Sequence, residues 1–241
     1  FRVHYALKAN VNPEILRLIR NAGFGADCVS GGEIQTAIEA GFPASSIVYA
    51  GVGKSDKEII LGLRNDIFCF NVESIPELEV INELAVRENK IASICLRVNP
   101  NIKAHTHTHI RTGVAENKFG IAFDEIMYVI KLANTMSNIT FKGLHFHIGS
   151  QITEMDDFIS LCMCINRLLE MMEVEGIKAE IINVGGGLGV DYDTPQMHAI
   201  PDFHAYFQTY INNLQLRPWQ TLHFELGRSV VAQCGTLFTR V

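Results

Sequence analysis

The stretch Tyr5-Ala6-Leu7-Lys8-Ala9-Asn10 carries a lysine where a strand-like run gives way to a helical pattern. Phe1 to Tyr5 has the β-branched and aromatic content typical of a strand, and Asn12-Pro13 opens a run with apolar residues at helical spacing. Lys8 is therefore expected at the end of the strand, against apolar surroundings. Such surroundings lower the pKa of an amine, and a neutral amine can form a Schiff base with a carbonyl group. The alternative is a solvated lysine without a chemical role.

Outward from this stretch, strand-like runs alternate with amphipathic helical patterns along the chain. The predicted strands are Arg2–Ala6, Gly25–Val29, Ile47–Ala50, Ile67–Asn71, Ser93–Val98, Phe141–His147, Glu180–Val184 and Thr221–Glu225. The predicted helices are Pro13–Ala22, Gly32–Ala40, Asp56–Arg64, Ile75–Glu88, Asp124–Met136, Asp157–Val174 and Asp202–Leu214, with another beginning at Ser229. This alternation predicts an α/β fold, a closed (β/α)8 barrel of the TIM type, and the 241 residues are close to its usual length of about 250. An open doubly wound sheet is the alternative.

The composition is that of a globular protein, with 48% hydrophobic and 19% charged residues. The net charge of -6 disfavours a general nucleic-acid binder, and no apolar run reaches the length of a membrane span. The 6 cysteines include no CxxC pair and are expected to be reduced core thiols. We expect a cytoplasmic protein that binds neither nucleic acid nor membrane. Because the chain starts at Phe1 and ends on an apolar run, we also expect residues 1–241 to be one barrel domain of a longer chain.

Reactive side chains gather at the ends of the predicted strands, and in a closed barrel the carboxyl ends of the strands form the working face. An amine, carboxylates, guanidiniums, an imidazole and a glycine loop are found there. These residues are Lys8, Asp27, Gly51, Asn71, Glu73, Arg97, His147, Ser150, Gly185–Gly187, Glu225 and Arg228. The set indicates a binding or catalytic site rather than a barrel without a ligand.

The glycine run from Gly185 to Gly189 follows a predicted strand. Glycines let backbone N–H groups surround an anion, most often a phosphate. Position 190 is Val190, so the run does not fit a dinucleotide fingerprint, and a tight turn is the structural alternative. Beyond the last predicted strand, Glu225 and Arg228 either form an internal ion pair or face a ligand. In the second case the carboxylate would meet a protonated heterocycle nitrogen, and the guanidinium a phosphate or carboxylate.

Two groups of histidines could suggest a metal. His145 and His147 alternate on one predicted strand and so share a face, and His105, His107 and His109 lie in the long polar stretch 99–120. No cluster of acidic residues completes either group, so a metal site is disfavoured. His147 could instead stack flat on an aromatic cofactor, whereas a solvated loop is favoured for the other three.

Several of these stretches also follow the order of a known family over essentially the whole chain. They are Tyr5–Asn10, Asp27–Ser30, Asn71–Ser74, Leu96–Pro100, Thr112-Gly113 with Lys118–Gly120, Gly143–Gln151, Asn183–Gly189 and Glu225–Ser229. Together they resemble the pyridoxal-phosphate-dependent decarboxylases built on an alanine-racemase-type barrel, and most closely the branch that acts on diaminopimelate. The family usually has a proline where this chain has Leu226.

The resemblance implies pyridoxal 5'-phosphate as the cofactor, with no metal. Lys8, His147 and Glu225 would be the catalytic residues: Lys8 forms the Schiff base, His147 stacks on the ring, and Glu225 faces the ring nitrogen. Asp27 would lie near the lysine and the ring. The remaining cofactor-binding positions that the resemblance implies are Ser150, Gly185, Gly186, Gly187, Leu226, Gly227 and Arg228.

The same resemblance implies an activity and partners. The expected reaction is decarboxylation of meso-2,6-diaminopimelate to L-lysine, the last step of lysine biosynthesis, with Arg228 and Arg111 as candidate partners of a substrate carboxylate. A homodimer with active sites at the subunit interface is also implied, together with a carboxyl-terminal β domain that this chain lacks. Ornithine- or arginine-type decarboxylases, a non-catalytic barrel that binds the cofactor and a racemase are alternatives. The last two would be expected to have arginine at the ring nitrogen, where this chain has Glu225.

Overall fold

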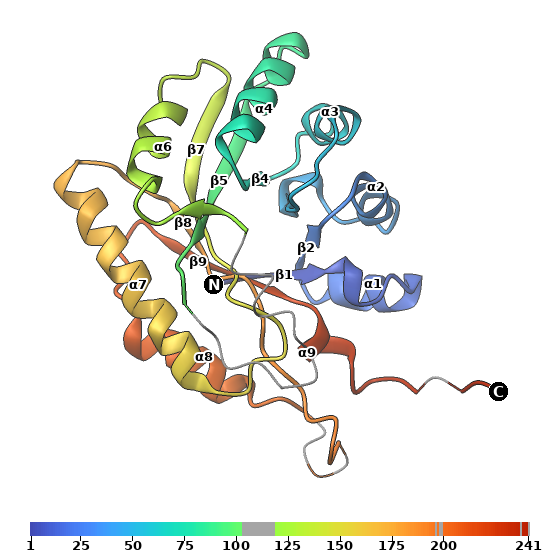
Figure 1. Cartoon of the computed structure of the whole chain (residues 1–241). Coiled ribbons are helices and arrows are strands. Elements are labelled where there is room, and N and C mark those ends of the chain that lie inside the picture. Colours follow the sequence, from blue (N-terminus) through green and yellow to red (C-terminus); the bar gives the residue numbers. More distant parts are fainter. Residues whose placement is uncertain (103–118, 196, 198–199, 237, 241) are drawn as a thin grey trace.

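The computed structural model describes residues 1–102, 119–195, 197, 200–236 and 238–240. A ring of parallel strands occupies its centre, with helices around it (Figure 1). The strands of the ring are β1 (Arg2–Ala6), β2 (Gly25–Cys28), β3 (Ile47–Tyr49), β4 (Cys69–Val72), β5 (Ala92–Asn99), β7 (Ile139–His145), β8 (Ile181–Asn183) and β9 (Thr221–Leu226). Successive strands of this set pair with each other, and β9 pairs back with β1. The predicted closed (β/α)8 barrel is therefore confirmed, and the open sheet is not.

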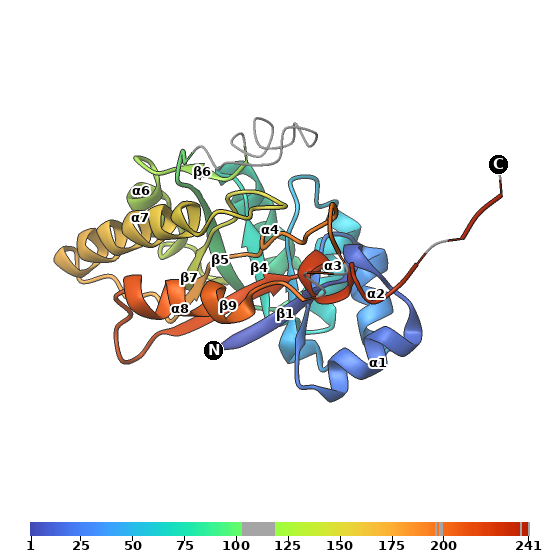
Figure 2. The same ribbon diagram turned by 90° about the horizontal axis from the view of Figure 1, so that it is seen from below.

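The helices lie outside the ring (Figure 2). They are α1 (Pro13–Asn21), α2 (Gly31–Glu39), α3 (Asp56–Arg64), α4 (Ile75–Arg87), α6 (Ile126–Ala133), α7 (Met155–Val174), α8 (Phe203–Asn213) and α9 (Arg228–Val231). Side chains cap several of them: Ser30, Ser74 and Asp202 each accept a hydrogen bond from a backbone N–H in the first turn of the following helix. Within the described ranges, no helix has the length and apolar character needed to cross a membrane.

Three short elements were not predicted. Leu7–Ala9 forms a 3-10 turn directly after β1, Ala44–Ser46 forms another, and β6 (Ile121–Ala122) pairs with the end of β5. Helix α7 begins at Met155, two residues before the predicted start, because Glu154 takes the capping position and the acidic residues fall in the first turn. Strand β7 ends at His145, so His147 lies just beyond the strand.

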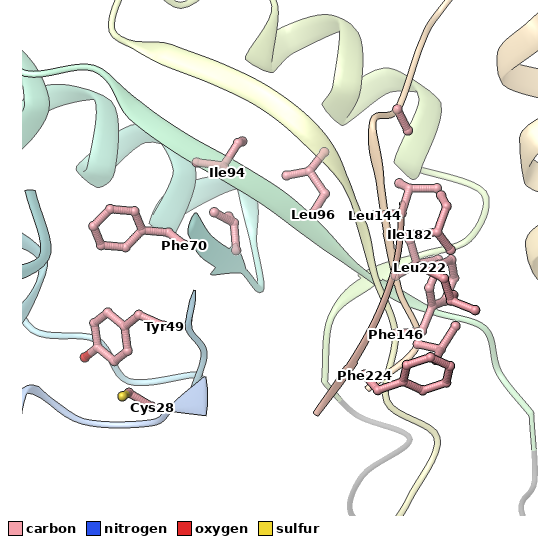
Figure 3. Close-up of a cluster of buried hydrophobic side chains, with 14 of the residues drawn as sticks. Cys28, Tyr49, Phe70, Ile94, Leu96, Leu144, Phe146, Ile182, Leu222 and Phe224 are labelled. Atoms are coloured by element: carbon pink, nitrogen blue, oxygen red, sulfur yellow. The ribbon is translucent and has the colours of Figure 1, made fainter. Parts of the chain in front are cut away.

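Alternate residues of each strand face opposite sides of the barrel wall. One set packs with the helices in the large apolar cluster, and Figure 3 shows several of its members along the strands: Cys28, Tyr49, Phe70, Ile94, Leu96, Leu144, Phe146, Ile182, Leu222 and Phe224. The other set faces the interior of the barrel. Its buried polar members are His4, Asp27, Asn71, Arg97, His145, Asn183, His223 and Glu225. A barrel interior is usually filled by branched aliphatic residues, so this polar filling marks the functional part of the fold.

Candidate active site

A cavity of about 660 Å³ opens where the strands end, and it is of the size usual for small-molecule sites. The turn after β1, the residues beyond β7 and β8, and the start of α9 contribute to its wall. Of the residues predicted for the site, Lys8, Asp27, His147, Ser150, Gly187, Glu225, Gly227 and Arg228 line it. The structure thus brings together groups that the sequence places at separate strand ends.

Four of the residues assigned to cofactor or substrate binding are not among those that line the cavity. Leu226 is buried in the apolar cluster shared with the helices, because it follows Glu225 on β9 and therefore faces outward. Gly185 and Gly186 lie behind the wall, against the backbone of neighbouring segments. Arg111, together with Thr112, Gly113, Lys118 and the histidines at 105, 107 and 109, lies outside the described residues.

Lys8 is exposed at the rim of the cavity, on the 3-10 turn that follows β1. The prediction that it packs against apolar surroundings is therefore wrong. The short turn rotates the side chain away from the buried residue before it, Leu7, and toward the cavity. Its positive charge acts on Asp27 and on His147, which places the amine among the ionisable groups of the site.

Glu225 is the buried acidic residue at the floor of the cavity, with its side chain 5% exposed. Asn71 and Asn183 each donate a hydrogen bond from Nδ2 to Glu225 Oε1, at 2.9 and 2.7 Å. His145 Nε2 lies 2.8 Å from Glu225 Oε2. The internal Glu225–Arg228 ion pair considered from the sequence is thus not what the structure shows.

The pKa values of the two carboxyl groups of the site, Glu225 and Asp27, are shifted in opposite directions. Burial raises the pKa of Glu225, but its attraction to His145 and its hydrogen bonds from His145 and Asn183 outweigh burial and hold the pKa well below the usual range. Burial and the nearby Glu225 charge raise the pKa of Asp27 well above its usual range. Glu225 is therefore ionised, while Asp27 favours its protonated form.

His147 has a neutral imidazole at physiological pH. Burial lowers its pKa to about 3, and the positive charges of Arg97 and Lys8 act in the same direction. Its Nδ1 accepts a long hydrogen bond of 3.4 Å from the backbone N–H of Gly186. The ring is thus held at the cavity wall as an uncharged group, which suits a flat contact with an aromatic ligand.

The glycine loop is explained largely by close packing of the backbone. A Cβ atom on Gly186 would lie 2.0 Å from the backbone oxygen of Glu225, and one on Gly185 would lie 2.3 Å from that of Phe146. The N–H of Gly185 is already bonded to Asn183 Oδ1 at 2.9 Å. Gly187, with φ of 99°, is the member of the run that lines the cavity. The loop therefore combines a turn with one glycine directed at the ligand space.

Arg228 and Tyr192 contact each other at the cavity wall. Arg228 Nη1 donates a hydrogen bond of 2.9 Å to the hydroxyl of Tyr192, and its guanidinium lies 5.9 Å from the centre of that ring. Both residues line the cavity. A guanidinium that is oriented in this way can bind a phosphate or a carboxylate through its remaining N–H groups.

Sequence reasoning did not assign the residues that support Glu225. These residues, which face inward at strand ends, are Asn71, His145 and Asn183. Their inward position could be predicted from the alternation of side chains along a strand. Nothing in the sequence shows that all three contact one carboxylate. Two further buried pairs stabilise the wall: Arg97 with Glu73 at 2.7 Å, and Lys54 with Glu77 at 2.6 Å. Lys54 also donates to the backbone oxygen of Asn71 at 2.8 Å.

The chain is similar in sequence to a known protein family and to known enzymes. Residues 1–232 match the family described as "Pyridoxal-dependent decarboxylase, pyridoxal binding domain". The diaminopimelate decarboxylase of Bacteroides thetaiotaomicron is 61% identical over 241 residues, which are 100% of this chain and 62% of that protein. The diaminopimelate decarboxylase of Helicobacter pylori strain J99 is 41% identical over 237 residues, or 98% of this chain and 58% of that protein.

Solved structures agree with the sequence comparison. Diaminopimelate decarboxylase from Helicobacter pylori in complex with L-lysine is 39% identical, with a TM-score of 0.88, and the match covers 96% of this chain and 58% of that one. The M. jannaschii enzyme in complex with L-lysine is 38% identical with a TM-score of 0.83, over 96% of this chain and 54% of that one. The chain thus spans less than two thirds of the length of each relative named here.

Proposed function

Because this chain belongs to the pyridoxal-dependent decarboxylases, through their pyridoxal-binding domain, we propose that the whole protein decarboxylates meso-2,6-diaminopimelate to L-lysine. The observation that carries the chemistry is the buried, ionised Glu225 at the floor of a cavity whose rim holds the Lys8 amine. The choice of substrate is supported by the relatives, which are diaminopimelate decarboxylases.

Two observations indicate that the cavity fits pyridoxal phosphate. Asp27 Oδ1 and His145 Nδ1 are buried polar atoms without a hydrogen-bond partner in the part of the chain that is described, and both residues line the cavity. Buried polar atoms are normally satisfied, so a polar ligand is expected there. Glu225 receives three donors, and a carboxylate offers about four lone-pair positions, so one remains for a protonated ring nitrogen.

The residues of this chain would divide the work as follows. Lys8 would tether the cofactor through its amine, and His147 would lie against the ring as an uncharged surface. Glu225 would hold the ring nitrogen protonated. Ser150, the glycine loop and the Leu226-Gly227-Arg228 turn would contribute to the phosphate site, with Arg228 or Arg111 meeting a substrate carboxylate. When bound, the cofactor supplies an electron sink for the electron pair left behind as carbon dioxide departs.

Carbon dioxide release decides the substrate. The whole protein, loaded with pyridoxal phosphate, is expected to release carbon dioxide from meso-2,6-diaminopimelate much faster than from ornithine or arginine. Faster release from ornithine or arginine would instead indicate a decarboxylase of the ornithine or arginine type. No release from any of them, with the cofactor bound, would favour a non-catalytic barrel.

We also propose that the protein acts in the cytoplasm as a homodimer with its active sites at the subunit interface. Two apolar side chains at the rim of the cavity support a covering partner: Val52 is 59% exposed and Tyr192 is 56% exposed. Light scattering of the whole protein at assay concentration tests this proposal. A monomer with full activity would contradict it.

A further inference from the structure

The two oxygens of the Glu225 carboxylate have unequal surroundings. Oε1 accepts hydrogen bonds from two amides, Asn71 and Asn183, whereas Oε2 accepts from one side chain, His145, at 2.8 Å. Each donor comes from a different strand, β4, β7 or β8. Amides cannot change their charge, so His145 is the one titratable donor among the three.

The position of the proton between His145 and Glu225 follows from their other contacts. An ionised carboxylate can only accept, so His145 Nε2 carries the hydrogen and donates it to Oε2. The second ring nitrogen, Nδ1, is buried and has no hydrogen-bond partner among the described residues. In the loaded protein Nδ1 would meet the polar ligand proposed above, whereas the Nε2–H of His145 is directed at Glu225.

Other charged and titratable groups face this pair from several elements. They are His4 on β1, Asp27 on β2, Cys95 on β5, His147 beyond β7 and His223 on β9. The positive charges of Arg97 and Lys8 act on Asp27 and His147.

We propose that His145 is a positioning residue for Glu225: as an Nε2–H donor, it occupies one lone pair of Oε2 and keeps the carboxylate ionised toward the cofactor's ring nitrogen. This inference rests on the proposed function. Without that donor, Glu225 becomes a stronger base and competes with the ring nitrogen for the proton that the two share. Glu225 would then hold the ring nitrogen protonated less well, and so support the electron sink less.

The test compares three variants of the whole protein, loaded with pyridoxal phosphate labelled with nitrogen-15 in its ring. His145→Leu removes the donor. His145→Gln keeps an N–H group at a similar distance from the backbone. His204→Leu, which changes an exposed histidine on α8, is the control. The ring nitrogen is expected to show the chemical shift of a protonated ring in the unchanged protein, in His145→Gln and in His204→Leu. In His145→Leu it is expected to move toward the unprotonated value. The rate constant kcat should fall about tenfold, with little change in KM.

The outcomes separate the inference from the proposed function. Failure of the unchanged protein to bind pyridoxal phosphate would refute the proposed function itself. Binding with a protonated ring in His145→Leu would overturn the role of His145 and leave the proposed function intact. Should His145→Leu not fold, the unchanged loaded protein, with nitrogen-15 in its histidines, still decides the question. A hydrogen on His145 Nε2 that is bonded to the Glu225 carboxylate supports the proposal, and an Nε2 without a hydrogen refutes it.

Discussion

His4 Nε2 lies 3.0 Å from His223 Nδ1 inside the barrel, on the strands β1 and β9 where the ring closes. His4 Nδ1 lies 3.1 Å from the backbone oxygen of Ser46, so it carries a hydrogen and donates it. Nε2 of the neutral His4 ring must then accept from Nδ1–H of His223. The two rings are stacked, with centroids 5.1 Å apart. This pair is thus a neutral hydrogen-bonded unit beneath the cavity.

We expect the pair to make the protein sensitive to acid. Burial lowers the pKa of both imidazoles, that of His223 to about 3, against an ordinary value of 6.5. Between those two values the unfolded state binds more protons than the native state, so the free energy of unfolding falls as the pH falls through this window. For His223 alone the loss between pH 7 and pH 5 is about 2 kcal/mol. Urea unfolding of His223→Asn, which keeps a donor but does not titrate, should show a smaller loss. His204→Asn, changed on the surface, should behave like the unchanged protein, and equal losses in all three would contradict the prediction.

Lys8 is expected to be the site of covalent attachment. Borohydride reduction of the protein loaded with pyridoxal phosphate should leave the mass of the cofactor on the peptide that contains Lys8, because its exposed amine lines the cavity. Lys8→Ala should lose this label and its activity. Lys57→Ala, which changes an exposed lysine on α3, should retain both. Labelling of another lysine in the unchanged protein would refute the assignment.

Asn183→Asp places a second carboxylate next to Glu225, where the amide nitrogen now lies 2.7 Å from Glu225 Oε1. Two buried carboxylates at this distance repel, so the pKa of one of them rises in the native state. The substitution should cost about 3 kcal/mol at pH 8, and the cost should shrink toward pH 5, because the native state then binds the additional proton. Urea unfolding at both pH values measures the effect. Asn212→Asp, on the exposed surface of α8, is the matched control and should show no such dependence.

Tyr192→Phe removes the hydroxyl that orients Arg228. The loss of one hydrogen bond to a charged group, about 1 kcal/mol, corresponds to about fivefold weaker binding of the anion that Arg228 contacts. A rise in the Kd of pyridoxal phosphate would identify that anion as the phosphate, whereas a rise in KM alone would identify a substrate carboxylate. Tyr128→Phe, on the exposed face of α6, should change neither value. Unchanged constants in Tyr192→Phe would remove Arg228 from both roles.

Much of the barrel could be predicted from periodicity and capping. The predicted bounds of β1 and α3 agree with the structure, and in the structure Ser74 caps α4 through the N–H of Glu77. Short elements such as the 3-10 turn at Lys8 have too few residues to show a period, and so the exposure of Lys8 was missed. The conformation of this turn, and not the apolar run before it, determines that Lys8 is exposed.

The candidate site could be predicted in its members but not in its contacts. Strand ends indicated Glu225, His147 and Arg228, because the topology alone brings such positions together. The outward position of Leu226 could have been predicted, because alternate residues of β9 face opposite sides of the barrel wall and Leu226 follows Glu225. The partners of Glu225 could not be predicted, because Asn71 is 154 positions away and only side-chain geometry selects it among the inward-facing residues.

The bond from Asn71 to Glu225 joins β4 to β9, which are not neighbours in the ring, across the interior of the barrel. Bringing together segments so distant along the chain is slow, because loop closure costs entropy before the contact can compensate for it. During refolding, helices and neighbouring strands can therefore form while the carboxylate still lacks its donors. Recovery of cofactor binding should then lag behind recovery of secondary structure, and it reports the moment at which the last strand joins the first.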